Sequence, residues 1–290
     1  MIQVRDQMKK VLITGANSYI GTSFEKYLQS FGEEYSVDTV DMTDSSWREK
    51  DFSGYDAVFH VAGIAHRKET EKNAELYYKV NRDLAADCAA KAKSDGVKQF
   101  VFLSSMSVYG LNSGYIDSDT LPNPKTNYGK SKLQAESALM KSESADFAVA
   151  VLRPPMIYGK GCRGNYNTLK KIALKSPFFP NIDNKRSMLY IENLCGFVRA
   201  LIDNRDRGLF FPQNKEYVNT TRLAELICKY NGKKFRPTVI FNPALYLLRK
   251  VAGSAEKAFG DLVYDMSMSE YSEKFAVTDT ETSIRFTEGK

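Results

Sequence analysis

Cysteine and histidine are scarce in this chain of 290 residues. The four cysteines form no Cys-x-x-Cys pair and there are only two histidines, so the ligand clusters of a zinc site are missing and no metal is expected. Isolated thiols of this kind are typical of a reducing cytosol, and no segment has the pattern of a signal peptide. We therefore expect a cytoplasmic protein.

Long apolar runs and blocks of like charge are also missing. The longest apolar stretch near the C-terminus, 243–248, is too short to cross a bilayer, so stable membrane insertion is not expected. The 41 basic and 35 acidic residues give a net charge of +6 that is spread along the chain, which does not indicate a nucleic-acid partner. A hydrophobic content of 43%, with 17 phenylalanines and 17 tyrosines, is enough for a substantial packed core.

Apolar runs of strand length alternate with helical patterns over the first half of the chain. This alternation predicts an α/β fold of the Rossmann type, a doubly wound parallel sheet with right-handed crossovers. The predicted strands are 10–14, 35–41, 56–61, 99–104 and 147–153, and the predicted helices are 19–31, 71–95 and 126–145.

The regular alternation ends near residue 160, where a glycine-rich loop begins. Further helices are predicted at 191–203, 221–231 and 243–260, and an irregular stretch at 176–181. We expect a small, discontinuous C-terminal substrate lobe. The predicted division is a nucleotide-binding domain of residues 1–158 plus about 188–209, and a lobe of about 159–187 plus 210–290.

A glycine turn follows the first predicted strand. Gly15 would allow a tight turn and Gly21 a close helix–strand contact, with a dinucleotide pyrophosphate on the amides at the start of the helix. Ser18 stands where the usual fingerprint has a middle glycine. Asp41, twenty residues past Gly21, is expected to bind the adenosine ribose, with Asp38 and Asp44 as alternatives.

Three residues later in the chain suit proton transfer. Tyr128 and Lys132 are four residues apart, which places them on one face of a helix. A nearby ammonium is expected to lower the pKa of the tyrosine, whose ordinary value is about 10. Ser105 could hold the reacting oxygen, with Ser104 and Ser107 as competitors, and the three residues suit an alcohol–ketone interconversion.

The chain resembles the extended short-chain dehydrogenase/reductase superfamily in the order of its motifs. The glycine turn comes first, then the acid after the second strand, then the serine, and then the Tyr-x-x-x-Lys pair. The wording of 153–161, Arg-Pro-Pro-Met-Ile-Tyr-Gly-Lys-Gly, is similar to bacterial nucleotide-sugar 4-epimerases and 4-keto-sugar reductases of surface-polysaccharide synthesis. The resemblance covers residues 10 to about 200 well and the remainder loosely. It selects Ser105, four residues before Tyr109, as the catalytic serine.

The resemblance implies NAD as cofactor, with NADP possible because Arg48 lies close enough in sequence to meet a 2′-phosphate. The implied cofactor contacts are Gly15, Asn17, Ser18, Tyr19, Ile20, Gly21, Asp41, Asp51, Phe52, Val61, Ala62, Gly63, Asn81, Ser104, Tyr128, Lys132, Arg153 and Pro154. The implied substrate contacts are Ser105, Met156, Asn165 and Arg186, with Arg186 on the diphosphate of a UDP-sugar. Tyr166, Cys162 and His66 are weaker candidates at the substrate edge, and a homodimer is expected.

Two departures from the superfamily narrow the reaction. Sugar-nucleotide 4,6-dehydratases place Asp-Glu directly after the catalytic hydroxyl residue, whereas Met106 and Ser107 follow Ser105 here, so dehydration is not expected. Many 4-epimerases carry Asn where Met156 stands, and an apolar residue suits a 6-deoxy sugar. The chain also lacks the second arginine motif usual for uridine-diphosphate binding.

Three functions follow from these features. The first is the reduction of a UDP-4-keto-6-deoxy-hexosamine at carbon 4. The second is a UDP-hexose 4-epimerase, of glucose/galactose or N-acetylhexosamine, that retains NAD. A cofactor-sensing regulator without catalysis is the third, which is disfavoured because such proteins often lose the Tyr-x-x-x-Lys pair that this chain keeps.

Overall fold

The computed structural model describes residues 8–65, 69–271 and 277–289. Two compact units share the chain. Unit 1 contains residues up to Val108, Pro124–Arg153 and Cys195–Phe210, and unit 2 contains Tyr109–Asn123, Pro154–Leu194 and Phe211 onward.

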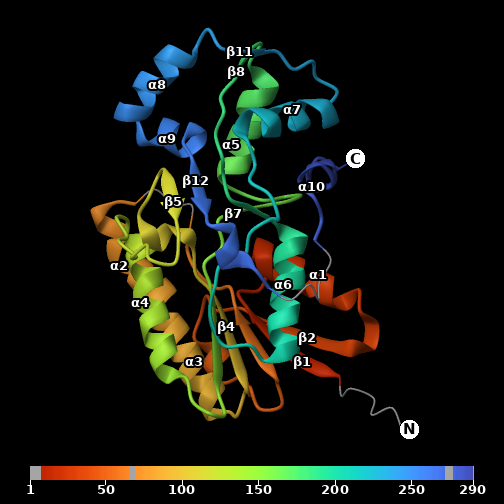
Figure 1. The fold of residues 1–290 in the computed structure, drawn as a ribbon. Coiled ribbons are helices and arrows are strands. Elements are labelled where there is room, and N and C mark those ends of the chain that lie inside the picture. The colour runs from red at the N-terminus through yellow and green to blue at the C-terminus, as the bar shows by residue number, and fades with distance from the viewer. Residues whose placement is uncertain (1–7, 66–68, 272–276, 290) are drawn as a thin grey trace. The chain divides into compact units, whose positions relative to one another are not determined.

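The centre of unit 1 is a six-stranded parallel sheet in the order β10-β6-β4-β3-β1-β2 (Figure 1). Its strands are β1 Lys9–Thr14, β2 Tyr35–Val40, β3 Ala57–His60, β4 Gln99–Leu103, β6 Ala148–Leu152 and β10 Gly208–Phe210. The strand order reverses next to β1, since β2 lies on one side of it and β3 on the other. In open parallel sheets a ligand binds at this switch point, beyond the carboxyl ends of the strands.

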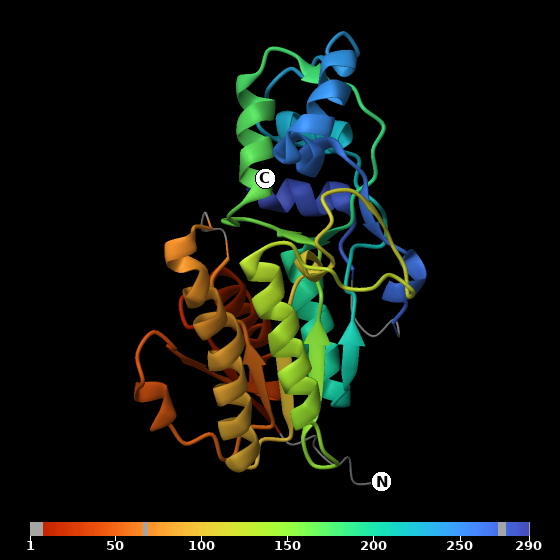
Figure 2. The ribbon, with the colours of Figure 1, turned by 90° about the vertical axis from the view of Figure 1, so that its left-hand side faces the viewer.

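Helices cover both faces of this sheet. Figure 1 and Figure 2 show α3 (Leu84–Ser94) and α4 (Asn127–Ser142) on one face, and α1 (Tyr19–Gln29) and α6 (Ile191–Asn204) on the other. Strands β3, β4 and β6 are buried along their whole length, as expected for strands with helices on both sides. The α/β class, the parallel sheet and the five predicted strands are confirmed.

Unit 2 combines short strand pairs with helices. Parallel pairs join β5 (Gly114–Ile116) to β12 (Leu262–Tyr264), β7 (Met156–Tyr158) to β9 (Met188–Tyr190), and β8 (Phe179–Pro180) to β11 (Pro237–Thr238). Its helices are α5 Asn165–Lys175, α7 Thr220–Tyr230, α8 Asn242–Val251, α9 Gly253–Phe259 and α10 Thr280–Thr287.

The structure differs from the sequence prediction in several places. Residues 109–123 were expected in the nucleotide-binding domain but belong to unit 2, because β5 pairs with β12 from the far end of the chain. The predicted helix 243–260 is two helices, since Ala252 is extended (φ −122°, ψ 103°). Helices α5 and α10 and the short strands of unit 2 were not predicted. The predicted helix 71–95 is divided into α2 (Ala74–Tyr78), a π-helical segment (Lys79–Asp83) and α3.

Candidate active site

The glycine turn after β1 has the conformation that its sequence predicts. Gly15 has φ +86°, and a Cβ added there would lie 3.0 Å from the backbone of Ala62, which follows β3. Thr14 and His60, the last residues of β1 and β3, are paired in register, and the Thr14 hydroxyl bonds His60 Nδ1 at 2.9 Å. The turn therefore lies at the switch point, and its left-handed conformation and its contact with the Ala62 backbone both require glycine.

Ser18, at the position of the usual middle glycine, caps the N-terminus of α1. Its backbone is extended (φ −74°, ψ 151°), and its Oγ accepts a hydrogen bond from Gly21 N at 3.1 Å. A Cβ at Gly21 would lie 2.8 Å from this Oγ, so the cap and Gly21 fit together. Asn17, at φ 63°, is one of the few non-glycine residues with a positive φ. Together with Tyr19 and Ile20, which begin α1, these residues form a helix N-terminus suited to an anion.

The acids in and after β2 differ in their hydrogen-bond partners. The carbonyl of Val40 accepts the amides of Gly15 and Ala16 at 2.9 and 3.1 Å, which holds Asp41 beside the glycine turn. Asp38 instead accepts the hydroxyl of Tyr55 at 2.7 Å, and Asp44 accepts both the amide and the hydroxyl of Ser46. The exposed carboxylate of Asp41 accepts the amide of Thr43 at 2.9 Å, and it remains the best placed of the three for a ribose.

Asp51, Phe52 and Arg48 have partners of their own. The Asp51 carboxylate accepts the amide and hydroxyl of Ser53, which hold its pKa below the ordinary value. Phe52 is fully buried in the core and its amide donates to Asp95 at 3.0 Å, so its side chain has a packing role. The guanidinium of Arg48 lies 2.6 Å from Asp87 and over the ring of Trp47.

We predict that Asp41 makes the protein prefer NAD over NADP, because a carboxylate accepts ribose hydroxyls and repels a 2′-phosphate. A hydrogen bond to a charged group contributes about 1.5–3 kcal/mol, so Asp41→Asn should weaken NAD binding by about tenfold to a hundredfold. Titration of both cofactors measures this, with Asp44→Asn as the matched control. Tighter NADP binding by the unmodified protein would contradict the prediction and point to Arg48.

Helix α4 positions the predicted acid–base pair. Thr126 caps the helix by accepting from Gly129 N at 3.1 Å, and Glu69 accepts the amides of Asn127 and Tyr128 at 2.8 and 3.0 Å. Both carboxylate oxygens of Glu69 therefore lie at the positive end of α4, where a negative charge is stabilising. The first turn, which carries Tyr128, is held from two sides.

The pKa of Tyr128 shifts opposite to the sequence prediction. Burial raises it, a hydrogen bond from Ser105 partly offsets the rise, and Tyr77 raises it further, whereas the ammonium of Lys132 is not among the causes. The side chain keeps a partly exposed surface even so. The phenol of Tyr128 is consequently protonated near neutral pH, which suits a proton donor. Ser105 Oγ also accepts the amide of Ser107 at 3.1 Å, and the two hydroxyl oxygens lie 3.1 Å apart.

Lys132 is buried, and its ammonium group is bound by a backbone carbonyl. Its Nζ donates to the carbonyl of Leu103, the last residue of β4, at 2.8 Å and lies 4.6 Å from the ring centroid of Phe102. Burial lowers its pKa to about 8, while Glu136 acts in the opposite direction. A Cβ added at Gly63 would lie 3.5 Å from Nζ, so the segment that follows β3 runs beside the lysine.

Asn81 ties the π-helical segment to the same region. It is fully buried; its Oδ1 accepts the amide of Ile64 at 2.8 Å, and its Nδ2 donates to the carbonyl of Ile64 and to Ser131 Oγ. Single π turns inside helices are frequent at functional sites. The stretch Val61, Ala62 and Gly63 is thereby fixed next to α4.

Glu136 is the main residue that sequence reasoning missed. Its carboxylate accepts the hydroxyl of Ser104 and a two-pronged bond from Arg153, whose Nη2 lies 2.7 Å from Oε2. Ser104 and Arg153 were predicted to contact the cofactor. In the structure, their side chains instead bind the carboxylate of Glu136. The sequence did contain a sign of Glu136, because this residue follows Tyr128 and Lys132 at the same spacing of four and so lies on the same helix face. Glu69 gave no comparable signal, since only the fold brings it to α4.

Three of the four predicted substrate residues, Met156, Asn165 and Arg186, lie in unit 2 together with the predicted cofactor contact Pro154, whereas Ser105 lies in unit 1. Pro154 is buried, Met156 begins β7 and is half-buried, and Asn165 is the exposed first residue of α5. The Nη1 of Arg186 donates to the carbonyl of Gly260 at 2.9 Å, and its backbone pairs with Val218. Burial lowers the pKa of this guanidinium, opposed by Asp261 and Glu256.

Tyr166 and Cys162 were the weaker substrate candidates. Tyr166 is buried and donates to Glu288 at 2.7 Å, and Cys162 is a buried free thiol, so both have structural surroundings. His66 lies outside the described residues. In the described part of the chain, no cluster of three or more potential metal ligands is present.

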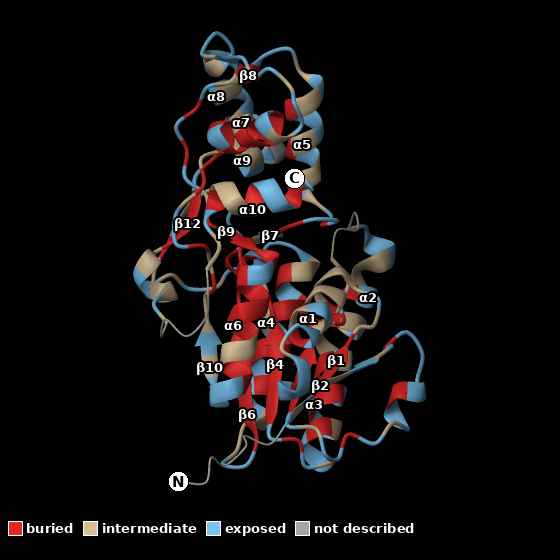
Figure 3. Cartoon of the chain, turned by 90° about the vertical axis from the view of Figure 1, so that its right-hand side faces the viewer, coloured by how far each residue is buried: buried red, intermediate tan, exposed pale blue. Residues whose placement is uncertain are grey.

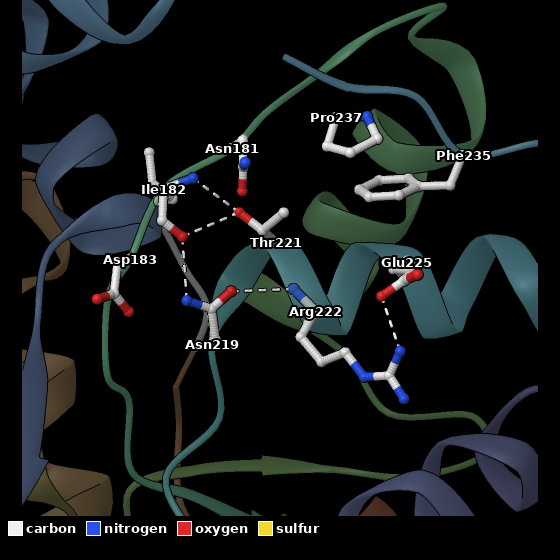
Figure 4. A pocket seen from close by; sticks show the side chains of 9 residues that line it. All are labelled: Asn181, Ile182, Asp183, Asn219, Thr221, Arg222, Glu225, Phe235 and Pro237. Carbon is white, nitrogen blue, oxygen red and sulfur yellow. Dashed lines mark hydrogen bonds and ion pairs between the residues drawn. The ribbon is translucent and has the colours of Figure 1, made fainter. Parts of the chain in front are cut away.

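A pocket of about 520 Å³ also lies in unit 2 (Figure 4). The polar groups that line it bind one another. Thr221 Oγ1 accepts the amide of Ile182, and Asn219 caps α7 by accepting the amide of Arg222. The guanidinium of Arg222 pairs with Glu225 at 2.7 Å. None of the predicted site residues lines it, so the candidate site rests on the chemistry in unit 1.

We predict that Arg186→Ala weakens the binding of UDP by about tenfold to a hundredfold, because a charge-assisted hydrogen bond contributes about 1.5–3 kcal/mol. Arg186→Lys should restore only part of the affinity, since an ammonium lacks the planar fork. Calorimetry with UDP alone is the measurement, and the exposed neighbour Lys185→Ala is the control. An unchanged affinity would assign the diphosphate to Lys160 or Arg163 instead.

The order of the sheet, the glycine turn at its switch point and the Ser105–Tyr128–Lys132 group define a dinucleotide-binding fold of the dehydrogenase kind. The model of the NAD dependent epimerase/dehydratase family matches residues 11–210. The chain belongs to this family, whose description agrees with the predicted cofactor.

Two curated relatives and one solved structure illustrate the similarity. The N-acetyl-alpha-D-glucosaminyl-diphospho-ditrans,octacis-undecaprenol 4-epimerase of Escherichia coli O157:H7 is 31% identical over 68% of this chain, and the match spans 64% of that relative's length. The UDP-glucose 4-epimerase of Vibrio cholerae is 29% identical over 69% of this chain and 68% of its own. The Bordetella bronchiseptica enzyme WbmG in complex with NAD has the same fold, with a TM-score of 0.74 at 20% identity over 99% of this chain and 94% of that one.

Proposed function

We propose that the protein is an NAD(P)-dependent enzyme that interconverts an alcohol and a ketone at carbon 4 of a diphosphate-linked sugar. The observation that carries the proposal is the arrangement of Ser105, Tyr128 and Lys132 at the end of β4 and the start of α4, next to the Gly15 turn. A bound nicotinamide cofactor would supply or accept the hydride. The Gly15–Gly21 turn and the start of α1 would hold its pyrophosphate, and Asp41 its ribose.

The chain's own residues would move the proton. Because burial keeps the Tyr128 phenol protonated near neutral pH, it can donate its proton to the sugar oxygen as a ketone is reduced. Ser105, which is hydrogen-bonded to this phenol, would orient the same oxygen. The carboxylate of Glu69 and the Thr126 cap hold the first turn of α4 in place, which limits the movement of the acid.

The reductive reaction is the first form of the proposal, with a UDP-4-keto-6-deoxy-hexosamine as substrate and polysaccharide synthesis as its setting. Met156 supports this, since an apolar residue suits a 6-deoxy sugar. The names of the relatives favour a second form, a 4-epimerase that retains NAD. In the name of the E. coli relative, the sugar is linked to a polyprenol diphosphate and not to a nucleotide. The group that carries the sugar therefore has to be tested separately from the reaction at carbon 4.

A substrate panel tests both forms. UDP-hexoses, UDP-N-acetylhexosamines, a UDP-4-keto-6-deoxy-hexosamine and a polyprenyl-diphosphate-linked N-acetylhexosamine are incubated with NADH, NADPH or no added cofactor. Net loss of nicotinamide absorbance with the keto sugar supports the reductase, and a change of product configuration without net loss supports the epimerase. Cofactor binding with no turnover of any sugar would contradict the proposal and favour a cofactor-sensing regulator.

A further inference from the structure

Residues 239–251, the loop before α8 and α8 itself, form an exposed apolar surface that we call the α8 segment. Helix α8 contains no buried residue (Figure 3). Ile240 and Val251 are 79% and 78% exposed. Seven large apolar side chains are exposed within these thirteen residues: Val239, Ile240, Phe241, Tyr246, Leu247, Leu248 and Val251. A concentration of apolar surface of this kind marks an interaction site.

Between Glu225 and Glu256, the sequence that contains the α8 segment carries charge of one sign. Residues 226–255 contain six lysines and arginines and no aspartate or glutamate: Lys229, Lys233, Lys234, Arg236, Arg249 and Lys250. Lys229 pairs with Glu281, Arg249 with Glu256, and Lys233 donates to carbonyls at the end of α5. In the residues the structure describes, Lys234, Arg236 and Lys250 form no ion pair, so these three cations remain for a partner.

We propose that the α8 segment is a docking surface for an anionic lipid bilayer. A helix with exposed Leu, Tyr and Val side chains and flanking cations lies in the plane of an interface, its apolar side chains among the headgroups and its cations on anionic lipids. A two-fold contact with a second copy would bring the same cations together, which is unfavourable. Ten residues cannot span the hydrocarbon core, and no helix among the described ranges meets the length and apolarity needed to do so.

The inference goes beyond the proposed function and does not depend on it. It assigns the enzyme a place at a membrane surface and leaves the chemistry at Tyr128 unchanged. A test on vesicles requires no sugar substrate, and turnover of a water-soluble UDP-sugar is a separate readout that should be the same in every variant below. Loss of that turnover with vesicle binding intact would count against the active-site assignment alone.

The first test uses sedimentation of the full chain with sucrose-loaded vesicles of phosphatidylcholine, with and without about a third of phosphatidylglycerol. We expect binding to the phosphatidylglycerol vesicles and a loss of about tenfold or more in affinity for L247S/V251S. These two residues are four apart on one helix face and are 67% and 78% exposed, so the fold does not depend on them. L121S, an 82% exposed leucine outside the segment, is the matched control.

The second test removes charge. K234Q/R236Q/K250Q should weaken binding by about fivefold for each cation at low salt, and added salt should weaken the binding of the unmodified protein. K26Q/K98Q/K141Q removes three exposed lysines of unit 1 as the control. Absence of binding to phosphatidylglycerol vesicles, or equal losses in test and control variants, would overturn the proposal. A concentration-dependent dimer that L247S/V251S dissociates would overturn it too and assign the surface to a second copy.

Discussion

Tyr128→Phe should lower turnover by roughly 10²–10⁴-fold and leave cofactor binding and the fold intact, because only the phenolic oxygen transfers the proton. The phenyl ring keeps the shape of the side chain, and the start of α4 is held by Thr126 and Glu69 through backbone amides that the substitution does not touch. The measurement is the rate on the best substrate of the panel, alongside a cofactor titration and a thermal melt.

A matched substitution separates this effect from a general one. Tyr115→Phe removes the hydroxyl of a tyrosine that is 54% exposed on β5 and should leave the rate close to that of the unmodified protein. Near-native turnover by Tyr128→Phe would show that another group donates the proton. Loss of cofactor binding together with turnover would instead show that the tyrosine is needed to form the site.

Glu136→Gln should have the largest effect on stability. The carboxylate of Glu136 and the guanidinium of Arg153 are 6% and 8% exposed, and removal of one member of a buried ion pair typically costs about 3–5 kcal/mol. The amide keeps the size of the side chain, so the loss measures charge rather than a cavity. Denaturant unfolding at neutral pH gives the change in the free energy of unfolding.

Two further variants make this prediction sharper. Asp87→Asn breaks the ion pair with Arg48, whose side chains are about half exposed, and should change the free energy of unfolding by about 0–1 kcal/mol. The double variant Glu136→Leu/Arg153→Met, which replaces both charges by apolar groups, should be closer to the unmodified protein than Glu136→Gln. A loss from Glu136→Gln no greater than that from Asp87→Asn would contradict the assigned role of the buried pair.

Local patterns in the sequence were sufficient for the parts of the fold that short segments determine. The strand–glycine–helix wording of 10–21 predicted β1, the turn at Gly15 and α1, and the spacing of Tyr128 and Lys132 predicted the helix that carries both. Strands buried on both faces must be apolar at successive positions, so β3, β4 and β6 were visible as apolar runs. The short strands of unit 2 were not visible, because two or three residues have no periodicity to detect.

The candidate site was predicted as a set of residues but not as a set of contacts. Ser105, Tyr128 and Lys132 could be selected from their order and wording. The direction of the Tyr128 pKa shift could not be predicted, because burial raises the pKa and Tyr77 raises it further, and both effects depend on the folded chain. Glu136 belonged to the same spacing of four as Tyr128 and Lys132, yet only its contact with Arg153 shows that it matters.

By itself, the sequence determined the class of fold, the place of the glycine turn and the residue types available for proton transfer, since these depend on local periodicity and backbone conformation. Tertiary structure decided which side chains meet. It brought Glu69 to the start of α4, turned Arg153 and Ser104 to Glu136, joined 109–123 to residues near the C-terminus, and left the apolar side chains of α8 exposed. The first three outcomes depend on contacts between segments that are distant in the chain, and the last on the absence of such contacts. A local pattern such as the spacing of four at Glu136 can single out a residue but does not name its partner.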